Sequence, residues 1–372
     1  MFKEIEIKGY RGLKNIKLKD LERINVLIGE NNSGKTSVLE AIQLFSSKNV
    51  IENAIAIARK REVQFAMPIG LRLMPYDMLL YSFPIDKQEI KEIDINGYRD
   101  DVGACHVSLR ADFHRDFFVP ESLKSSEMRI YEQICDEDGF IRTVSGEYLY
   151  DCKYQDTKKF YLSEIQTKAE IFDENGERHK ISTLLPKKLS VLYVSPADIY
   201  SNRILSASLY KGMLVDEKRR LIELLRLFDD RIIGIEVGVQ YGRAVTLIEM
   251  EDCGLVPVSI FGDGLKKVLT LASAVVKTRG GILLIDEFET GIHKHALIQV
   301  AKWLAMATER YDVQVFVTTH SDDAIDALVS AQDDYNNINA YRLEHYKDRI
   351  FVKKFEGTDL YRLRREQGMD IL

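Results

Sequence analysis

The chain has 372 residues, of which 45% are hydrophobic and 30% are charged, and its formal net charge is −6. A chain of this length and composition can bury a sizeable core as an ordinary soluble globular protein. The mild net acidity argues against a protein that coats nucleic acid over its whole surface, although it permits a local basic patch.

Neither the cysteines nor the apolar runs indicate a secreted or membrane protein. No C-x-x-C pair or zinc spacing occurs, so we expect free thiols in a reducing cytosol at Cys105, Cys135, Cys152 and Cys253. The N-terminal MFKEIEIKGY alternates charged and apolar residues, unlike a signal peptide. The most apolar long run, residues 67–86, holds Arg72, Asp77 and three prolines and is a poor membrane span. We therefore expect a cytoplasmic protein.

The N-terminal region predicts strands followed by a helix. The alternation in FKEIEIKGY predicts an edge strand, and NIKLKDL predicts a second short strand. The segment INVLIG, residues 24–29, is nearly all apolar, as a buried strand should be. After a polar loop, Val38, Ile42 and Phe45 share one helical face.

The middle of the chain, from about residue 46 to residue 185, predicts a helix and an antiparallel sheet. The helix is VIENAIAIARKREVQF, and the strands include ACHVSLRADF and GFIRTVSGEYLYDCKYQ. We find no heptad repeat long enough for a coiled-coil arm, and no internal repeat.

The C-terminal half alternates strands and helices. Predicted strands are LSVLYVSP, IIGIEVGV, RAVTLIEM, GILLIDE, VQVFVTTHS, NAYRLEH and RIFVKKF. Predicted helices are EKRRLIELLRLF, GDGLKKVLTLASAVVK, KHALIQVAKWLAMATERY and DLYRLRREQ. This alternation predicts an α/β fold with parallel strands in the core of its sheet.

One loop matches a phosphate-binding pattern. Residues 29–36, GENNSGKT, fit G-x-x-x-x-G-K-[ST] and stand between a predicted strand and a predicted helix. Glycines let backbone N–H groups approach phosphate oxygens, and the following helix aims its positive end at the same anion. Lys35 can reach the β- and γ-phosphates, and the hydroxyl of Thr36 can ligate Mg²⁺.

Two acidic residues end the strand in GILLIDEFETGIH. Asp286 stands where a carboxylate would hold Mg²⁺, and Glu287 could polarise an attacking water as a general base. A strand that merely ends in surface acids is the simpler interpretation, but the phosphate-binding loop makes the catalytic one stronger.

Two further segments fit a nucleotide site. In VQVFVTTHS, His320 follows a buried strand and could contact the γ-phosphate or the water. In SIFGDGLKK, Gly262 and Gly264 precede a helix and offer another anion-binding start, which makes sense if it caps the nucleotide of a partner subunit. In isolation, a simple glycine turn before a helix is the favoured interpretation of the second segment.

These four elements, in this order, resemble the ATPase head of the ATP-binding-cassette (ABC) type. The similarity is greatest to its non-transporter branch, which comprises SMC and RecF-like heads and the ATPase part of the OLD (overcoming lysogenization defect) family. GENNSGKT, FGDGLKKVLTLA, LLIDEFETGIH and VFVTTHS resemble AAA/OLD-like ATP-binding proteins of bacterial anti-phage loci.

The resemblance implies an α/β P-loop NTPase with a mixed sheet, a parallel core flanked by helices, an antiparallel β-lobe and a helical insertion. It divides the chain into residues 1–48, which carry the loop, 49–185 as an inserted helical and β lobe, and 186–372 as the rest of the head. It also implies ATP and Mg²⁺ as cofactors, and a homodimer or higher even-numbered homo-oligomer in which two loops face two glycine turns.

The roles known in the family fall on matching positions of this chain. Nucleotide binding falls on Gly29, Asn31, Asn32, Ser33, Gly34, Lys35, Thr36 and Ser37 and, across the dimer, on Gly262, Asp263 and Gly264. Magnesium binding falls on Thr36 and Asp286, and catalysis on Lys35, Glu287 and His320. Arg11, in GYRGLKNI, matches an arginine that often meets the nucleotide.

The chain also departs from the family pattern. Gly262 replaces the signature serine of transporters, and neither a long coiled-coil arm nor room for a TOPRIM nuclease domain is evident. Any nuclease would then be a separate chain. The Q-loop glutamine is not assigned, because Gln133, Gln155 and Gln166 all suit it.

Three functions follow as hypotheses. The first is an ATPase sensor or switch in anti-phage defence that acts on a separate effector, such as a TOPRIM-type nuclease. The second is a RecF-like, ATP-dependent DNA-binding repair factor, whose basic faces would include Lys187, Lys188, Arg220 and Arg365, although such runs are more often solvated helix surfaces. The third, the energising subunit of a transporter, fits FKEIEIKGYRGLKNIKL and DEFETGIH poorly and would need a membrane partner.

Overall fold

The chain folds as two compact units. The computed structural model describes residues 1–46, 49–64, 74–84, 90–101, 103–114, 141–151, 157–165, 168–173, 178–179, 190–200, 215–240, 243–347 and 349–371. Unit 1 comprises Met1, Asp20–Leu39 and Ser190–Leu372, and unit 2 comprises Phe2–Lys19 and Glu40–Leu189.

Unit 1 is built on a six-stranded sheet in the order β10-β14-β15-β3-β16-β17. The strands are β3 (Ile24–Ile28), β10 (Val191–Val194), β14 (Ile282–Ile285), β15 (Gln314–Thr318), β16 (Ile338–Tyr346) and β17 (Arg349–Glu356). All neighbouring pairs are parallel except β16 and β17. Every residue of β3, β14 and β15 is buried, which explains their nearly continuous apolar sequences.

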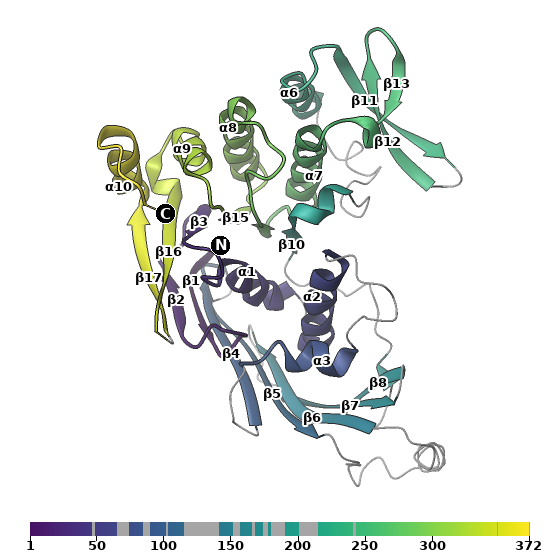
Figure 1. The fold of residues 1–372 in the computed structure, drawn as a ribbon, viewed down its shortest axis with the longest axis vertical. Coiled ribbons are helices and arrows are strands. Elements are labelled where there is room, and N and C mark those ends of the chain that lie inside the picture. The colour runs from purple at the N-terminus through teal and green to yellow at the C-terminus, as the bar shows by residue number, and fades with distance from the viewer. Residues whose placement is uncertain are drawn as a thin grey trace. The chain divides into compact units, whose positions relative to one another are not determined.

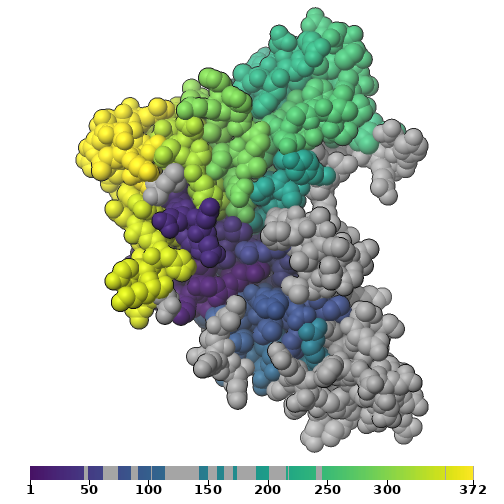
Figure 2. All heavy atoms as spheres, viewed as in Figure 1, coloured from purple at the N-terminus to yellow at the C-terminus, as the bar shows by residue number. Residues whose placement is uncertain are grey.

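Helices complete the core of unit 1. They are α1 (Lys35–Gln43), which runs on into unit 2, α6 (Val215–Leu225), α7 (Asp263–Lys277), α8 (Lys294–Arg310), α9 (Asp322–Ser330) and α10 (Gly357–Tyr361), which continues as the π-helical turn Arg362–Glu366. Buried residues of α6 to α10 join those of the sheet in one apolar cluster. Figure 1 shows α7, α8 and α9 in succession along the sheet, and Figure 2 shows the outer surface of the same part of the chain in green and yellow.

A small antiparallel sheet extends unit 1 beside α6. It consists of β11 (Ile232–Gln240), β12 (Arg243–Met250) and β13 (Gly254–Pro257) in that order. Short 3-10 turns stand at Leu44–Ser46, Pro196–Tyr200, Val258–Ile260 and Tyr335–Asn337. The turn Val258–Ile260 leads from the small sheet into α7 (Figure 1).

In the residues that the structure describes, unit 2 is an antiparallel sheet of eight strands in the order β2-β1-β4-β5-β6-β7-β8-β9, accompanied by two helices. The strands are β1 (Phe2–Lys8), β2 (Ile16–Lys19), β4 (Ile90–Arg99), β5 (Gly103–His114), β6 (Ile141–Asp151), β7 (Thr157–Ile165), β8 (Lys168–Asp173) and β9 (Arg178–His179). The helices are α2 (Val50–Gln64) and α3 (Pro75–Leu80), and α2 contacts β5 and β6.

The predicted fold class is confirmed, but one strand assignment is wrong. The segment FKEIEIKGY was expected at a sheet edge, whereas β1 pairs with β2 on one side and with β4 on the other. Alternation reports that one face of a strand is buried, and it does not distinguish an edge strand from an interior one. Residues Phe2–Lys19 also group with unit 2 instead of sharing a unit with the loop at 29–36.

No helix within the described ranges is long and apolar enough to cross a membrane.

Candidate active site

The loop between β3 and α1 has the backbone that its sequence predicts. Gly29, Asn32 and Gly34 have φ values of 134°, 64° and 97°, in the region that glycine and asparagine tolerate best. A Cβ atom on Gly29 would lie 2.4 Å from the carbonyl oxygen of Leu343, so no side chain fits there. Such turns gather backbone N–H groups on one side and form a concave anion site. We call residues 29–36 the phosphate loop.

Lys35 lies inside the phosphate loop. Only 4% of the residue is exposed, and its Nζ donates to the carbonyl oxygens of Gly29 at 2.8 Å and Glu30 at 2.7 Å. Burial lowers the pKa of Lys35 to about 8, against the opposing effect of nearby carboxylates. A pKa near 8 keeps the ammonium group charged at neutral pH, so the loop presents a fixed cation at the start of α1.

Asp286 is the centre of a hydroxyl cluster at the end of β14. Its Oδ1 accepts from Thr318 Oγ1 at 2.6 Å, its Oδ2 accepts from Tyr193 OH at 2.7 Å, and Thr36 Oγ1 lies 3.2 Å from both oxygens. The parallel register explains this, because β10 and β15 flank β14 and end level with it. We call Thr36, Tyr193, Asp286 and Thr318 the Asp286 cluster.

The Asp286 cluster fits a magnesium ion. Mg²⁺ prefers oxygen ligands and commonly takes only one or two from the protein, the rest coming from water and phosphate. The hydroxyl of Thr36 and the carboxylate of Asp286 are hard oxygen donors in contact with each other. Among the described residues no group of three or more His, Cys, Asp or Glu side chains could hold a metal.

Glu287 is fixed from three sides. Its backbone has a φ of 50°, which is unusual for a residue with a side chain. Its N–H donates to Thr318 Oγ1 at 2.9 Å, and its carbonyl oxygen accepts from Lys267 Nζ at 3.1 Å. Its Oε2 accepts from Thr290 Oγ1 at 3.0 Å. These contacts hold the carboxylate immediately beyond the Asp286 cluster.

His320 is anchored through its backbone, and its side chain is exposed to solvent. Its N–H donates to Oε1 of Glu289 at 2.8 Å. The other carboxylate oxygen of Glu289, Oε2, is buried without a hydrogen-bond partner in the part of the chain that the structure describes. The carboxylate of Glu289 therefore fixes the backbone of His320 just after the end of β15.

Gly262, Asp263 and Gly264, which we call the glycine turn, begin α7. Gly262 is the N-cap residue, with a φ of −65°. Because it has no side chain, it makes no side-chain capping hydrogen bond. Asp263 Oδ2 accepts from Tyr200 OH at 2.6 Å. A Cβ atom on Gly264 would lie 2.6 Å from the ring of Phe228, so this glycine is required by packing.

The structure brings together most of the predicted site residues. The phosphate loop, Ser37, Asp286, Glu287 and His320 lie at the carboxyl ends of the adjacent strands β3, β15 and β14. Arg11 is different, because it belongs to unit 2 and pairs through Nε with Glu40 Oε2 at 3.0 Å. Glu40 also pairs with Arg61.

Sequence reasoning missed three residues of the site, namely Tyr193, Thr318 and Lys267. The first two could have been found, since each occupies a strand end that the parallel order places beside Asp286. Lys267 carries no such signal, because a lysine in the first turns of a helix is usually solvated. The predicted Gln133, Gln155 and Gln166, and the basic pair Lys187 and Lys188, lie outside the described residues.

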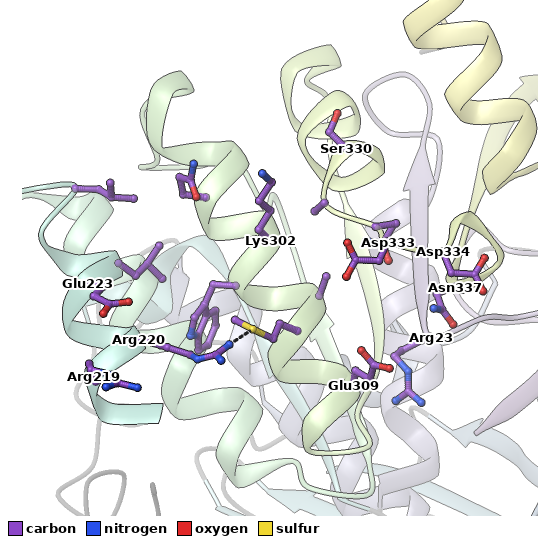
Figure 3. A pocket seen from close by; sticks show the side chains of 18 residues that line it. Arg23, Arg219, Arg220, Glu223, Lys302, Glu309, Ser330, Asp333, Asp334 and Asn337 are labelled. Carbon is purple, nitrogen blue, oxygen red and sulfur yellow. Dashed lines mark hydrogen bonds between the residues drawn. The ribbon is translucent and has the colours of Figure 1, made fainter. Parts of the chain in front are cut away.

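Unit 1 also has a groove of about 1010 Å³ between α6, α8 and the end of α9 (Figure 3). Basic and acidic side chains both line it, among them Arg220, Lys302, Glu309 and Asp333. Arg220 turns toward the sulfur of Met306. None of the predicted nucleotide-binding residues lines this groove, so it is separate from the phosphate loop.

Comparisons with known proteins identify a family that this chain matches. A family model described as "AAA ATPase domain" matches residues 1–223, and one described as "AAA domain, putative AbiEii toxin, Type IV TA system" matches residues 155–326. An "ATP/GTP phosphatase" of Helicobacter pylori is 23% identical over 380 residues, which are 97% of either chain. The "DNA replication and repair protein RecF" of Rickettsia massiliae is 51% identical over 41 residues, 11% of either chain. The solved SMC head bound to the C-winged helix domain of ScpA aligns with a TM-score of 0.49 at 12% identity and 99% coverage of both chains.

Proposed function

Because the chain belongs to the AAA ATPase domain family, we propose that it hydrolyses ATP at the phosphate loop and works as a dimerising sensor or switch subunit. The observation that carries the proposal is the Asp286 cluster. It joins the hydroxyl of Thr36, at the start of α1, to the carboxylate that ends β14, with Glu287 next in the chain. This is the arrangement that magnesium-dependent hydrolysis at a P-loop requires.

Each side chain has a defined task in this proposal. The N–H groups of the phosphate loop and the ammonium group of Lys35 bind the β- and γ-phosphates. Thr36 and Asp286 hold Mg²⁺, which when bound would neutralise phosphate charge. Glu287 accepts a proton from the attacking water, and His320, exposed at the end of β15, contacts the γ-phosphate.

The glycine turn supports the dimer part of the proposal. The start of α7 offers backbone N–H groups and a positive helix end, while the phosphate loop of the same chain already holds one triphosphate. We assign Gly262, Asp263 and Gly264 to the nucleotide of a partner copy. Hydrolysis then requires two chains, each of which completes the site of the other.

The sensor part of the proposal requires a separate effector. The match to an AbiEii-like family of toxin–antitoxin systems supports a component of a defence system. We propose that the nucleotide state is passed to a separate effector protein, such as a TOPRIM-type nuclease, in cytoplasmic anti-phage defence.

Phosphate release by the full chain with Mg²⁺ and ATP tests the proposal. Turnover per chain should rise with protein concentration until the dimer saturates. Glu287→Gln should reduce turnover by roughly 10²-fold or more, because the general base is lost, while ATP binding persists and a nucleotide-bound dimer accumulates on size exclusion. Turnover that stays constant per chain down to demonstrable monomer would exclude the dimer.

A second candidate is a RecF-like DNA-binding ATPase, which the local similarity to RecF favours. The basic run near the C-terminus supports it weakly, because two of its three arginines are already paired with carboxylates. Arg364 contacts Asp326 at 2.8 Å, and Arg362 contacts Asp359 at 3.0 Å. ATP-stimulated duplex binding that weakens steeply with salt would favour this candidate over the sensor.

A further inference from the structure

A second buried lysine stands beside the site, on α7. Lys267 is 0% exposed, although it lies in a helix whose neighbouring residues, Leu265, Val268 and Leu269, form part of the apolar core. A buried ammonium group costs free energy unless partners compensate it, and an apolar side chain of similar length would fill the same space without that cost. Packing alone therefore does not account for a lysine here.

The partners of Lys267 lie mainly in the segment of residues 286–289, which carries the proposed general base. Its Nζ donates to the carbonyl oxygen of Glu287 at 3.1 Å. The carboxylates of Asp286, Glu289, Glu287 and Asp198 stabilise its charge, while burial lowers its pKa to about 8. Lys267 is therefore a charged group at neutral pH that is aimed at the backbone of the proposed general base.

Glu287 needs such a contact, because its backbone is in the left-handed region. A residue with a side chain adopts this conformation at a cost and keeps it only where the surroundings hold it. Thr318 fixes the N–H side of Glu287 and Lys267 fixes the carbonyl side. Removing one contact lets this peptide rotate and moves the carboxylate away from the Asp286 cluster.

We propose that Lys267 is a positioning residue that holds Glu287 in its catalytic orientation and thereby connects the glycine turn to hydrolysis. This inference rests on the proposed function. Lys267 lies one turn beyond Gly264 on the same helix, so a shift of α7 when the glycine turn meets a partner's nucleotide is passed to Glu287 of its own chain. Each chain then senses at α7 whether it is part of a closed dimer.

The test compares Lys267→Met with Thr270→Val in the full chain. Thr270 is also fully buried on α7, and its hydroxyl donates to the carbonyl oxygen of Lys266, within the helix. We expect Lys267→Met to lower kcat by about 10- to 100-fold, as loss of a positioning group commonly does, with the Kd for ATP within about threefold of wild type. Thr270→Val should change neither value by more than about twofold.

The Glu287→Gln background separates positioning from general damage. If Lys267 acts through Glu287, then adding Lys267→Met to Glu287→Gln lowers turnover no further, because residues that act as a unit are not additive. An equal loss in both backgrounds, or a kcat within twofold of wild type, overturns the inference. If Lys267→Met does not fold, Lys267→Leu, which also lacks a donor, is measured in its place by the same criteria. A wild-type chain without ATP turnover would instead overturn the proposed function.

Discussion

The starts of α1 and α7 follow glycine-rich turns, but the two turns use glycine differently. In the phosphate loop, Gly29 and Gly34 have positive φ values, and Gly29 stands against the backbone of Leu343. In the glycine turn, Gly262 has an ordinary φ of −65°, and no atom of the described residues lies within 4 Å of a Cβ built on it. The first turn needs glycine to fold, whereas the second has a glycine at Gly262 that the fold of the described residues does not require.

This difference agrees with the proposal that only the phosphate loop is complete within one chain. The phosphate loop surrounds its own lysine and contacts the Asp286 cluster, so its glycines are explained by intramolecular geometry. Gly262 has no side chain at the N-terminus of α7, where a serine or aspartate would cap the helix better. A missing side chain at an anion-binding helix start is explained if another molecule approaches the backbone there.

The largest effect is expected at the phosphate loop. Lys35→Met removes the charge that α1 and the loop present to the phosphates, and a charge-assisted contact of this kind is worth enough to weaken ATP binding by roughly 100-fold. Equilibrium binding of a fluorescent ATP analogue checks this. Folding should be kept, since methionine fills the space of the lysine stem, and a melting temperature near that of wild type serves as the control. Unchanged binding would remove the phosphate loop from the site.

The second-largest effect is expected at Gly262, and it concerns how turnover depends on protein concentration. Gly262→Asp supplies a better N-cap, so α7 should be at least as stable as before, but it places a carboxylate where the phosphate of a partner's nucleotide would lie. We expect ATP binding to stay within about twofold, while the rise of turnover with protein concentration disappears.

Gly262→Ser is the matched control for this experiment. It caps the helix without a charge and restores the side chain found in the transporter signature, so turnover should remain concentration-dependent. If Gly262→Asp and Gly262→Ser behave alike, the start of α7 does not meet a nucleotide.

The third prediction concerns stability and distinguishes the two glycines of the glycine turn, Gly262 and Gly264. A side chain on Gly264 would meet the ring of Phe228 at 2.6 Å and the carbonyl oxygen of Gly291 at 2.8 Å. Gly264→Ser should therefore lower the free energy of unfolding by about 1–3 kcal/mol, whereas Gly262→Ser should change it by less than about 0.5 kcal/mol. Chemical denaturation of both variants measures the difference. It also shows that a substitution at Gly264 cannot test the dimer cleanly.

The elements of unit 1 could be predicted from the sequence because their patterns are local. Fully apolar strands such as β3 and β14 differ clearly from the amphipathic helices that follow them. Sheet order is not local, and that is why β1 was wrongly expected at an edge. Which strand pairs with β1 depends on β4, which follows it by some eighty residues and meets it only in the fold.

The candidate site shows the same limit. Lys35 and Asp286 belong to sequence motifs in which the neighbouring residues indicate the chemistry, so each could be assigned from the sequence. The ammonium group of Lys267 reaches the site from α7, and only the packing of α7 brings it there. Arg11 matches a family position, yet its observed partner is Glu40, a contact that the pattern did not reveal.

The smallest expected effect is a pH dependence of the free energy of unfolding, which distinguishes the buried Lys267 of α7 from a solvated helix lysine. Burial lowers the pKa of Lys267 to about 8 in the folded chain, against 10.5 for an unperturbed lysine. Between these values the unfolded chain binds more protons than the folded one, so stability rises with pH. The carboxylates that face the lysine are those of Asp198, Asp286, Glu287 and Glu289. Relative to Lys267→Met, the free energy of unfolding of the wild type should therefore be flat below pH 8 and should increase by about 1 kcal/mol between pH 8 and pH 9. A difference that stays constant over this range would mean that Lys267 titrates like a solvated lysine and is not held in the core beside Glu287.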